Sequence, residues 1–192
     1  RDWSSDVCSS DLRHARRILQ ERGANPDVTK GLLNIVKSNP FDHRQLRGLL
    51  ALQVTGGLDE KTALSLLDHT NQYVRAFAIQ FLCENKNPSD AALKKFAELA
   101  TKDKSQIVRL YLASGLLRTP VEKRWDVLHG LLAHAEDAKD HNLPYMYWYA
   151  AEGSVAADPN RGIKLMTDSK IAKVRENIAR RIAVGSKAVA AQ

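Results

Sequence analysis

A short pair of residues, an apolar side chain followed by arginine, recurs along the chain and constrains its fold more than any other feature. The pairs end at Arg13, Arg47, Arg75, Arg109 and Arg175. The last interval is about twice as long as the others, and Met146 divides it at the place where a further arginine would be expected. A recurrence at roughly 30 residues is typical of helical hairpins that bury their apolar sides against one another in a stack. The pattern predicts an all-α solenoid.

Helical periodicity dominates between these pairs, and the strand-like alternation of apolar and polar residues is nearly absent. Proline stands near the expected start of several helices, at Pro26, Pro88, Pro120 and Pro159. We expect a repeat domain over 13–184, with about five hairpins preceded by a single helix at 13–22. A flexible tail is expected over 185–192.

The repeating unit resembles a HEAT repeat. Asp68 precedes Val74-Arg75, and Asp103 precedes Val108-Arg109 at a similar distance. The resemblance implies a right-handed α-solenoid in which an aspartate of each turn pairs with arginines of its own or a neighbouring repeat. It assigns this ladder role to Asp68, Arg75, Asp103 and Arg109, and with altered spacing to Arg47 and Arg175. Asp140 is expected at the corresponding place in the repeat that contains Met146.

The opening segment 1–12, RDWSSDVCSSDL, differs in character from everything that follows. It lacks the basic and apolar regions of a secretory signal. The segment resembles the translated end of a common sequencing adapter, so we expect residues 1–12 to be an artefactual tail outside the folded domain. A signal peptide and the true termini are then not observable. Without this tail, which carries one Arg and three Asp, the net charge is +9 instead of +7.

The positive charge raises the possibility of a nucleic-acid partner, and some HEAT-like proteins are DNA glycosylases. However, Arg75, Arg109 and Arg175 fall at ladder positions, and another group of arginines lies near the two ends, at Arg13, Arg16, Arg17, Arg180 and Arg181. They are not interleaved with aromatic residues in a stripe of the kind that tracks a phosphate backbone. Nucleic acid is not favoured, and a stand-alone HEAT protein that binds nucleic acid or acidic partners is kept as the alternative function.

One polar stretch, HGLLAHAEDAKDHN, contains enough imidazole and carboxylate groups for a metal site. The candidate ligands are His129, His134, His141, Glu136, Asp137 and Asp140. His129 and His134 are five positions apart, a spacing that places them on different faces of a helix. We therefore interpret the stretch as a solvated turn and expect no metal ligand here.

The aromatic run PYMYWY is a candidate docking surface, because tyrosine and tryptophan are enriched at binding hot spots. Its members are Tyr145, Tyr147, Trp148 and Tyr149. Consecutive residues point around a helix, so we expect some of these rings in the core and the others on a concave surface.

Patterns for catalysis are missing from the sequence. It has no GxSxG elbow and no glycine-rich phosphate loop. Cys83 lies in the apolar run AFAIQFLCE, where a buried thiol is expected. We expect no catalytic residue and no cofactor in this chain, and no apolar run approaches the roughly 18 residues of a membrane span.

A closer resemblance rests on HAEDAKDHNLPYMYWY, on AADP and on SKIAKVRENIARR. Over about 13–184, the chain is similar to the HEAT region of PVC-type haem-binding CxxCH proteins, also called membrane-bound dehydrogenase-like bacterial proteins. That family tends to have Glu-Pro after the aromatic run, where this chain has Glu152-Gly153. In the family a β-propeller precedes the HEAT segment and a c-type cytochrome domain follows it. The resemblance implies a non-catalytic, periplasmic scaffold whose partners are these domains of the same parent chain.

Overall fold

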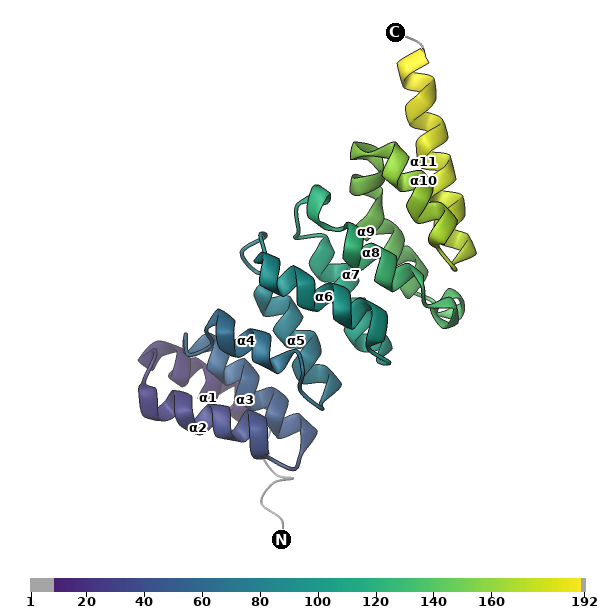
Figure 1. Ribbon diagram of the computed structural model, residues 1–192. Coiled ribbons are helices and arrows are strands. Elements are labelled where there is room, and N and C mark those ends of the chain that lie inside the picture. Colours follow the sequence, from purple (N-terminus) through teal and green to yellow (C-terminus); the bar gives the residue numbers. More distant parts are fainter. Residues whose placement is uncertain (1–8, 191–192) are drawn as a thin grey trace. The chain divides into compact units, whose positions relative to one another are not determined.

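The computed structural model describes residues 9–190. All regular structure in this range is helical, with 11 α-helices, two short 3₁₀ helices and no strand (Figure 1). The predicted all-α class is therefore confirmed. No helix in the same range has the length and apolar character that crossing a bilayer requires. The chain divides into two compact units, and the boundary, between Val74 and Arg75, falls inside a helix.

The N-terminal unit contains four complete helices and the beginning of a fifth. They are α1 (Ser9–Arg22), α2 (Pro26–Ser38), α3 (Asp42–Val54), α4 (Glu60–Leu66) and the first turn of α5 (Gln72–Leu82). Helix α3 packs against both α1 and α2. Val36 of α2 and Leu49 and Leu52 of α3 are completely buried and form the centre of this core.

The C-terminal unit contains the rest of α5 and the six helices that follow. These are α6 (Asp90–Lys102), α7 (Gln106–Leu116), α8 (Trp125–Leu132), α9 (Leu143–Ala157), α10 (Pro159–Asp168) and α11 (Ala172–Ala190). The 3₁₀ helix η1 (Val121–Lys123) precedes α8, and η2 (Ala135–Lys139) precedes α9. These short segments lie where the chain turns between long helices.

From α6 onwards, each helix packs against the next helix and the next but one. Helix α6 contacts α7 and α8, α7 contacts α8 and α9, and α9 contacts α10 and α11. The even-numbered helices α6, α8 and α10 thus form one layer, and the odd-numbered helices α7, α9 and α11 form a second (Figure 1). Every internal helix closes a core with neighbours on both sides.

Short polar side chains begin most of these helices. Ser89, Ser105 and Asp158 each accept a hydrogen bond from a backbone N–H in the first turn that follows. Such caps satisfy N–H groups that have no partner within the helix. Pro26 and Pro159 occupy the first helical position, as the sequence predicts, because that position needs no N–H donor.

Close approach of α6 and α8 depends on a glycine. A methyl group built on Gly130 would lie 2.8 Å from Ala100 Cβ and 3.0 Å from the Ala100 carbonyl carbon. Gly130 is buried, and these backbone and Cβ atoms of Ala100 cannot swing aside as the tip of a flexible side chain could. The absence of a side chain at residue 130 therefore sets how near the two helices lie.

Both ends of the repeat domain differ from the predicted boundaries. Helix α1 begins at Ser9, so the end of the predicted 1–12 tail belongs to a helix, while residues 1–8 lie outside the described part. Helix α11 continues to Ala190, where a tail was expected from 185; residues 191–192 also lie outside. A lone Gly185 costs a helix only about 1 kcal/mol, and the neighbouring alanines favour its continuation.

Candidate functional site

The centre of the C-terminal unit is a buried ion pair between Arg109 of α7 and Asp137 of η2. Arg109 donates from Nε to Asp137 Oδ2 and from Nη2 to Oδ1, both over 2.6 Å. The third guanidinium nitrogen, Nη1, donates to the backbone carbonyl of Asp103 over 2.8 Å. Both ionic side chains are almost completely buried, at 2% and 0% exposure. Arg109 therefore joins the turn of its own hairpin to the turn of the next.

Two further donors complete the coordination of Asp137. The hydroxyl of Tyr147 donates to Oδ2 over 2.6 Å, and Gln106 Nε2 donates to Oδ1 over 3.1 Å. Burial alone would raise the pKa of Asp137, but the hydrogen bonds from Arg109, Tyr147 and Gln106 together hold it below its ordinary value. Burial and the bond to Asp137 raise the pKa of Tyr147. The network is thus stable as a carboxylate, a guanidinium and a neutral phenol.

A second ion pair repeats this arrangement one hairpin earlier. Arg75 of α5 donates from Nε to Asp103 Oδ2 over 2.7 Å and from Nη2 to Oδ1 over 3.0 Å. Asp103 Oδ1 also accepts from the backbone N–H of Ser105, which shapes the turn before α7. In both pairs the aspartate follows the arginine by 28 residues. The structure thus brings together Arg75, Asp103 and Arg109, three of the predicted ladder residues.

In the N-terminal unit, two neutral amides occupy the comparable place. Asn71 donates from Nδ2 to Gln45 Oε1 over 2.9 Å and to the Asp42 carbonyl over 3.1 Å. Gln45 in turn donates from Nε2 to the carbonyl of Asn39 over 2.8 Å. Gln45 lies six positions after the turn residue whose carbonyl it contacts, as Arg109 does relative to Asp103.

The ladder differs from the prediction in the repeat after Arg109. Asp137, one of the residues of the metal candidate stretch, takes the position expected for Asp140. Asp140 instead accepts from the backbone N–H groups of Asn142 and Leu143 over 2.8 Å, and so caps the start of α9. A signal for Asp137 exists in the sequence, because the step from Asp103 to Asp137 equals the step from Arg75 to Arg109.

Arg47 and Arg175 have other surroundings than the ladder prediction gave them, while the ladder role of Asp68 stays a prediction. Arg47 is exposed, and Gln45, two positions earlier, makes the contacts expected of it. Arg175 donates from Nη1 to the Ser169 carbonyl over 2.9 Å, so it keeps the contact within its own hairpin. The side chain of Asp68 is exposed.

The three histidines of the metal candidate stretch lie apart. His134 contacts Glu136 Oε1 through Nδ1 over 2.7 Å and the Ala100 carbonyl through Nε2 over 2.8 Å. His129 lies 3.5 Å from Asp168, and His141 faces a hollow on a different side. Within residues 9–190, no three His, Cys, Asp or Glu side chains are grouped so that they could hold a metal ion.

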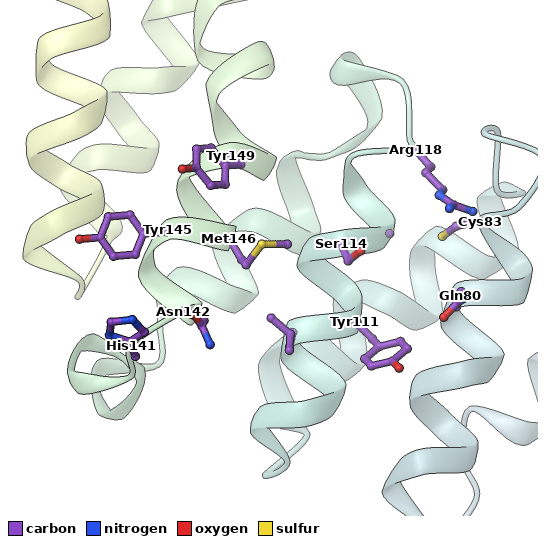
Figure 2. Close-up of a pocket in the computed structure, with 12 residues that line it drawn as sticks. Gln80, Cys83, Tyr111, Ser114, Arg118, His141, Asn142, Tyr145, Met146 and Tyr149 are labelled. Carbon is purple, nitrogen blue, oxygen red and sulfur yellow. The ribbon is translucent and has the colours of Figure 1, made fainter. Parts of the chain in front are cut away.

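A hollow of about 710 Å³ crosses α5, α7 and α9; we call it the inner groove (Figure 2). Helix α9 contributes Tyr145, Met146 and Tyr149, and α7 contributes Leu110, Tyr111 and Ser114. Gln80 and Cys83 line it from α5 and the turn at its end. Three successive odd-numbered helices thus supply the wall of one hollow.

An aromatic row runs across these helices at a constant step. The interval from Phe77 to Tyr111 equals that from Tyr111 to Tyr145, so the three rings occupy the same register on α5, α7 and α9. The rings of Phe77 and Tyr111 are in contact, with centroids 5.4 Å apart and planes inclined by 46°. Tyr145 and Tyr149 are about half exposed, at 47% and 52%. Such rings offer a large contact area at low cost in side-chain entropy.

The predicted docking surface over the aromatic run is therefore corrected in part. Tyr145 and Tyr149 line the inner groove and are accessible. Tyr147 is completely buried and serves the ion-pair network, so it offers no surface to a partner. Trp148 is half-buried and does not line the groove. The helical turn of about 100° per residue separates neighbours along the run in this way.

Positive charge and hydrogen-bonding groups accompany the tyrosines. Arg118 lines the groove near Cys83, and His141 and Asn142 line it near Tyr145 (Figure 2). No aspartate or glutamate is among its lining residues. Burial raises the pKa of the Cys83 thiol to about 12, although Arg118 opposes this, so Cys83 is a neutral part of the wall.

Comparison of the chain with protein-family models, curated proteins and solved structures gives no match. The two structural features available for a functional interpretation are therefore the ion-pair ladder, which lies inside the C-terminal unit, and the inner groove, which lies on its surface. Buried ion pairs connect helices, whereas an exposed aromatic groove is suited to contact with another molecule.

Proposed function

We propose that the chain is a HEAT-type, right-handed α-solenoid that acts as a non-catalytic scaffold and docking segment of a larger bacterial redox protein. The observation that carries this proposal is the recurrence of an Arg–Asp pair at one register. Arg75–Asp103 and Arg109–Asp137 both join a helix to the turn of the next hairpin. A ladder of this kind is the property that the resemblance to HEAT repeats implies.

The packing of the C-terminal unit supports a stacking architecture. Its helices alternate between two layers and contact the next helix and the next but one. In such a stack each repeat contacts only its neighbours, so helices stacked as in this unit extend in one direction and offer long surfaces. These are suitable properties for a spacer between two domains.

The state of Cys83 supports the non-catalytic part of the proposal. A nucleophilic cysteine needs a lowered pKa and access to its substrate. Cys83 is 1% exposed, and burial raises its thiol pKa to about 12. It contributes volume to the contact with Gly115, where an added methyl group would lie 2.9 Å from Sγ.

The resemblance supplies the rest of the proposal. In the family of haem-binding CxxCH proteins, a dehydrogenase-like propeller and a c-type cytochrome flank the HEAT segment. The proposed partners are these domains of the same parent chain, in the cell envelope. The chemistry of the parent chain is expected in these flanking domains, and the role of this segment is to hold them at a productive distance.

Sequencing of the gene on both sides of this segment tests the assignment. A propeller upstream and a CxxCH motif downstream are expected, and stop codons close to either side contradict the proposal. In the parent protein, replacing 13–184 by a Gly/Ser linker of equal length should slow haem reduction by the propeller's substrate. A flexible chain holds two domains at a lower effective concentration than a stack of suitable length. An unchanged rate would show that the segment is not a spacer.

A further inference from the structure

We propose that the inner groove binds an extended acidic peptide segment of a protein partner, with Arg118 pairing a carboxylate near Cys83 and Tyr145 and Tyr149 holding an apolar side chain further along the peptide (Figure 2). This inference rests on the proposed docking function and names the chemistry of its partner. It concerns a surface that lies entirely within the C-terminal unit.

Charge complementarity indicates that the bound segment of the partner is negatively charged. Arg118 is exposed, and within the described residues it forms no ion pair. With no acid in the lining, an incoming carboxylate meets a cation and no competing negative charge. Guanidinium and carboxylate form paired, charge-assisted hydrogen bonds, which are stronger than those between neutral groups.

The polar groups of the lining match a peptide backbone. Gln80, Ser114 and Asn142 each carry both a donor and an acceptor, and they come from α5, from α7 and from the turn before α9. An extended chain presents alternating N–H and C=O groups along its length. A groove that crosses three helices offers partners for these groups at several points, which a compact small acid would not use.

The tyrosines explain why the peptide should also carry an apolar residue. Tyr145 and Tyr149 are one helical turn apart, so their rings lie on the same face of α9. Both are about half exposed, and Met146 lies between them in the chain and also lines the groove. Tyrosine and arginine together are among the side chains most often found at binding hot spots.

The same lining disfavours a nucleic acid. Binding of a phosphate backbone requires several cations, because affinity comes from the release of the counterions that they replace. Arg118 is the one arginine or lysine among the lining residues. A single permanent charge suits a single carboxylate far better than a row of phosphates.

Selection from a phage-displayed library of random dodecapeptides, panned against the full chain, tests the inference. We expect the selected peptides to carry Asp or Glu and, separated from it along the peptide, an aromatic or aliphatic residue. For a selected peptide labelled with fluorescein, Arg118→Gln should raise the Kd about tenfold, since one charge-assisted contact is lost. Tyr149→Ala should raise it about fivefold, because an aromatic contact is lost.

Two matched controls separate the groove from general effects. Lys164→Gln removes one exposed positive charge from α10, and Tyr73→Ala removes an exposed ring from the N-terminal unit. Both should leave the Kd within about twofold of the unchanged protein. Thermal unfolding followed by circular dichroism should be the same for Arg118→Gln as for the parent, because this side chain is exposed.

Each alternative outcome has a distinct meaning. Selected peptides that are neutral or basic, yet lose affinity with Tyr149→Ala, would overturn the acidic partner and retain docking at the groove. Failure to select any peptide that depends on Tyr149 or Arg118 would overturn both the inference and the docking function. If instead a DNA duplex binds, loses affinity steeply with salt and depends on Arg118, the groove is a nucleic-acid site and the peptide inference is wrong.

Discussion

The two units solve the same structural problem with different chemistry. Where one hairpin meets the next, the N-terminal unit uses the neutral amides Gln45 and Asn71, while the C-terminal unit uses Arg109 and Asp137. The amide contact spans 26 residues and the ionic contact 28. Both link a helix to the turn of the following hairpin, so the geometry of the stack does not depend on charge.

What differs is the consequence of losing a partner. A buried amide left alone costs about 1–3 kcal/mol, whereas a buried ion left alone costs several kcal/mol. The ion pair therefore specifies the position of the next hairpin more strongly, because a misplaced hairpin would leave a buried charge unpaired. Where the contact is between two neutral amides, a misplaced hairpin costs less stability.

Asp137→Ala should have the largest effect on stability. It leaves the Arg109 guanidinium buried without its carboxylate and removes the acceptor of Tyr147 and Gln106. We expect a loss of about 3–5 kcal/mol in the free energy of unfolding. Urea denaturation in a Trp3→Phe background measures it, since the remaining tryptophans, Trp125 and Trp148, both lie in the C-terminal unit.

The double variant Arg109→Met/Asp137→Leu is the control for this prediction. It removes both charges and keeps apolar volume, so it should recover much of the lost stability. If the single and double variants were equally unstable, shape rather than unpaired charge would explain the loss, and the contrast between the units would be one of packing.

Acid should weaken the ionic unit through the same carboxylate. The pKa of Asp137 is held below its ordinary value of 3.8, so its contribution to stability is fully present above that pH. The contribution is lost as the pH falls below 3.8 towards the lowered folded-state value. Urea midpoints followed by tryptophan fluorescence between pH 6 and 2.5 measure this. The Arg109→Met/Asp137→Leu variant should show a flatter curve, and an equally steep one would contradict the assignment to this pair.

Asn71→Ala tests the neutral ladder and should have an intermediate effect. It leaves Gln45 Oε1 and the Asp42 carbonyl without this donor, at a cost of about 1–3 kcal/mol. Hydrogen exchange of α3 amides measures local opening in the N-terminal unit. The loss should be nearly independent of pH between 3 and 7, because neither amide titrates, and a strong pH dependence would show that the unit relies on an unrecognised charge.

Glu136→Gln should have the smallest effect. Glu136 lies 3.7 Å from Arg109 and contacts His134, but its side chain is 61% exposed. Its pKa is lowered by hydrogen bonds from its own backbone and from His134, while solvent screens the charge. We expect the free energy of unfolding to change by less than about 0.5 kcal/mol in the urea experiment. If Glu136→Gln lowered the free energy of unfolding as much as Asp137→Ala does, Glu136 and not Asp137 would be the essential acid of the ladder.

The period of the apolar–arginine pairs was sufficient to predict the all-α class, and the resemblance to HEAT repeats singled out Arg75, Arg109 and Asp103. Asp140 was predicted in place of Asp137, because both lie in one polar stretch and Asp140 stands before Met146 at the distance at which Asp103 stands before Arg109. The choice is made by η2, which turns Asp137 inwards and leaves Asp140 to cap α9. Applying the step between the two arginines to Asp103, instead of counting back from Met146, gives the correct aspartate.

Two other features depend on three-dimensional context. Gln45 replaces an arginine in the ladder, and no charge marks it in the sequence. Among the four aromatic residues at 145–149, only the direction of each ring around α9 separates Tyr147 in the core from Tyr145 and Tyr149 in the groove. That direction depends on which face of α9 packs against the neighbouring helices. The sequence of the aromatic run alone does not show this.

The 28-residue interval between Arg109 and Asp137 has a consequence for synthesis on the ribosome. When α7 emerges, the carboxylate that will neutralise Arg109 has not yet been made, and only the Asp103 carbonyl is in place. At typical translation rates of about 5–20 residues per second, the wait lasts roughly 1–6 s. During it, burying α7 would desolvate an uncompensated cation. Each hairpin of this unit is thus expected to complete its folding only when the turn of the next one arrives.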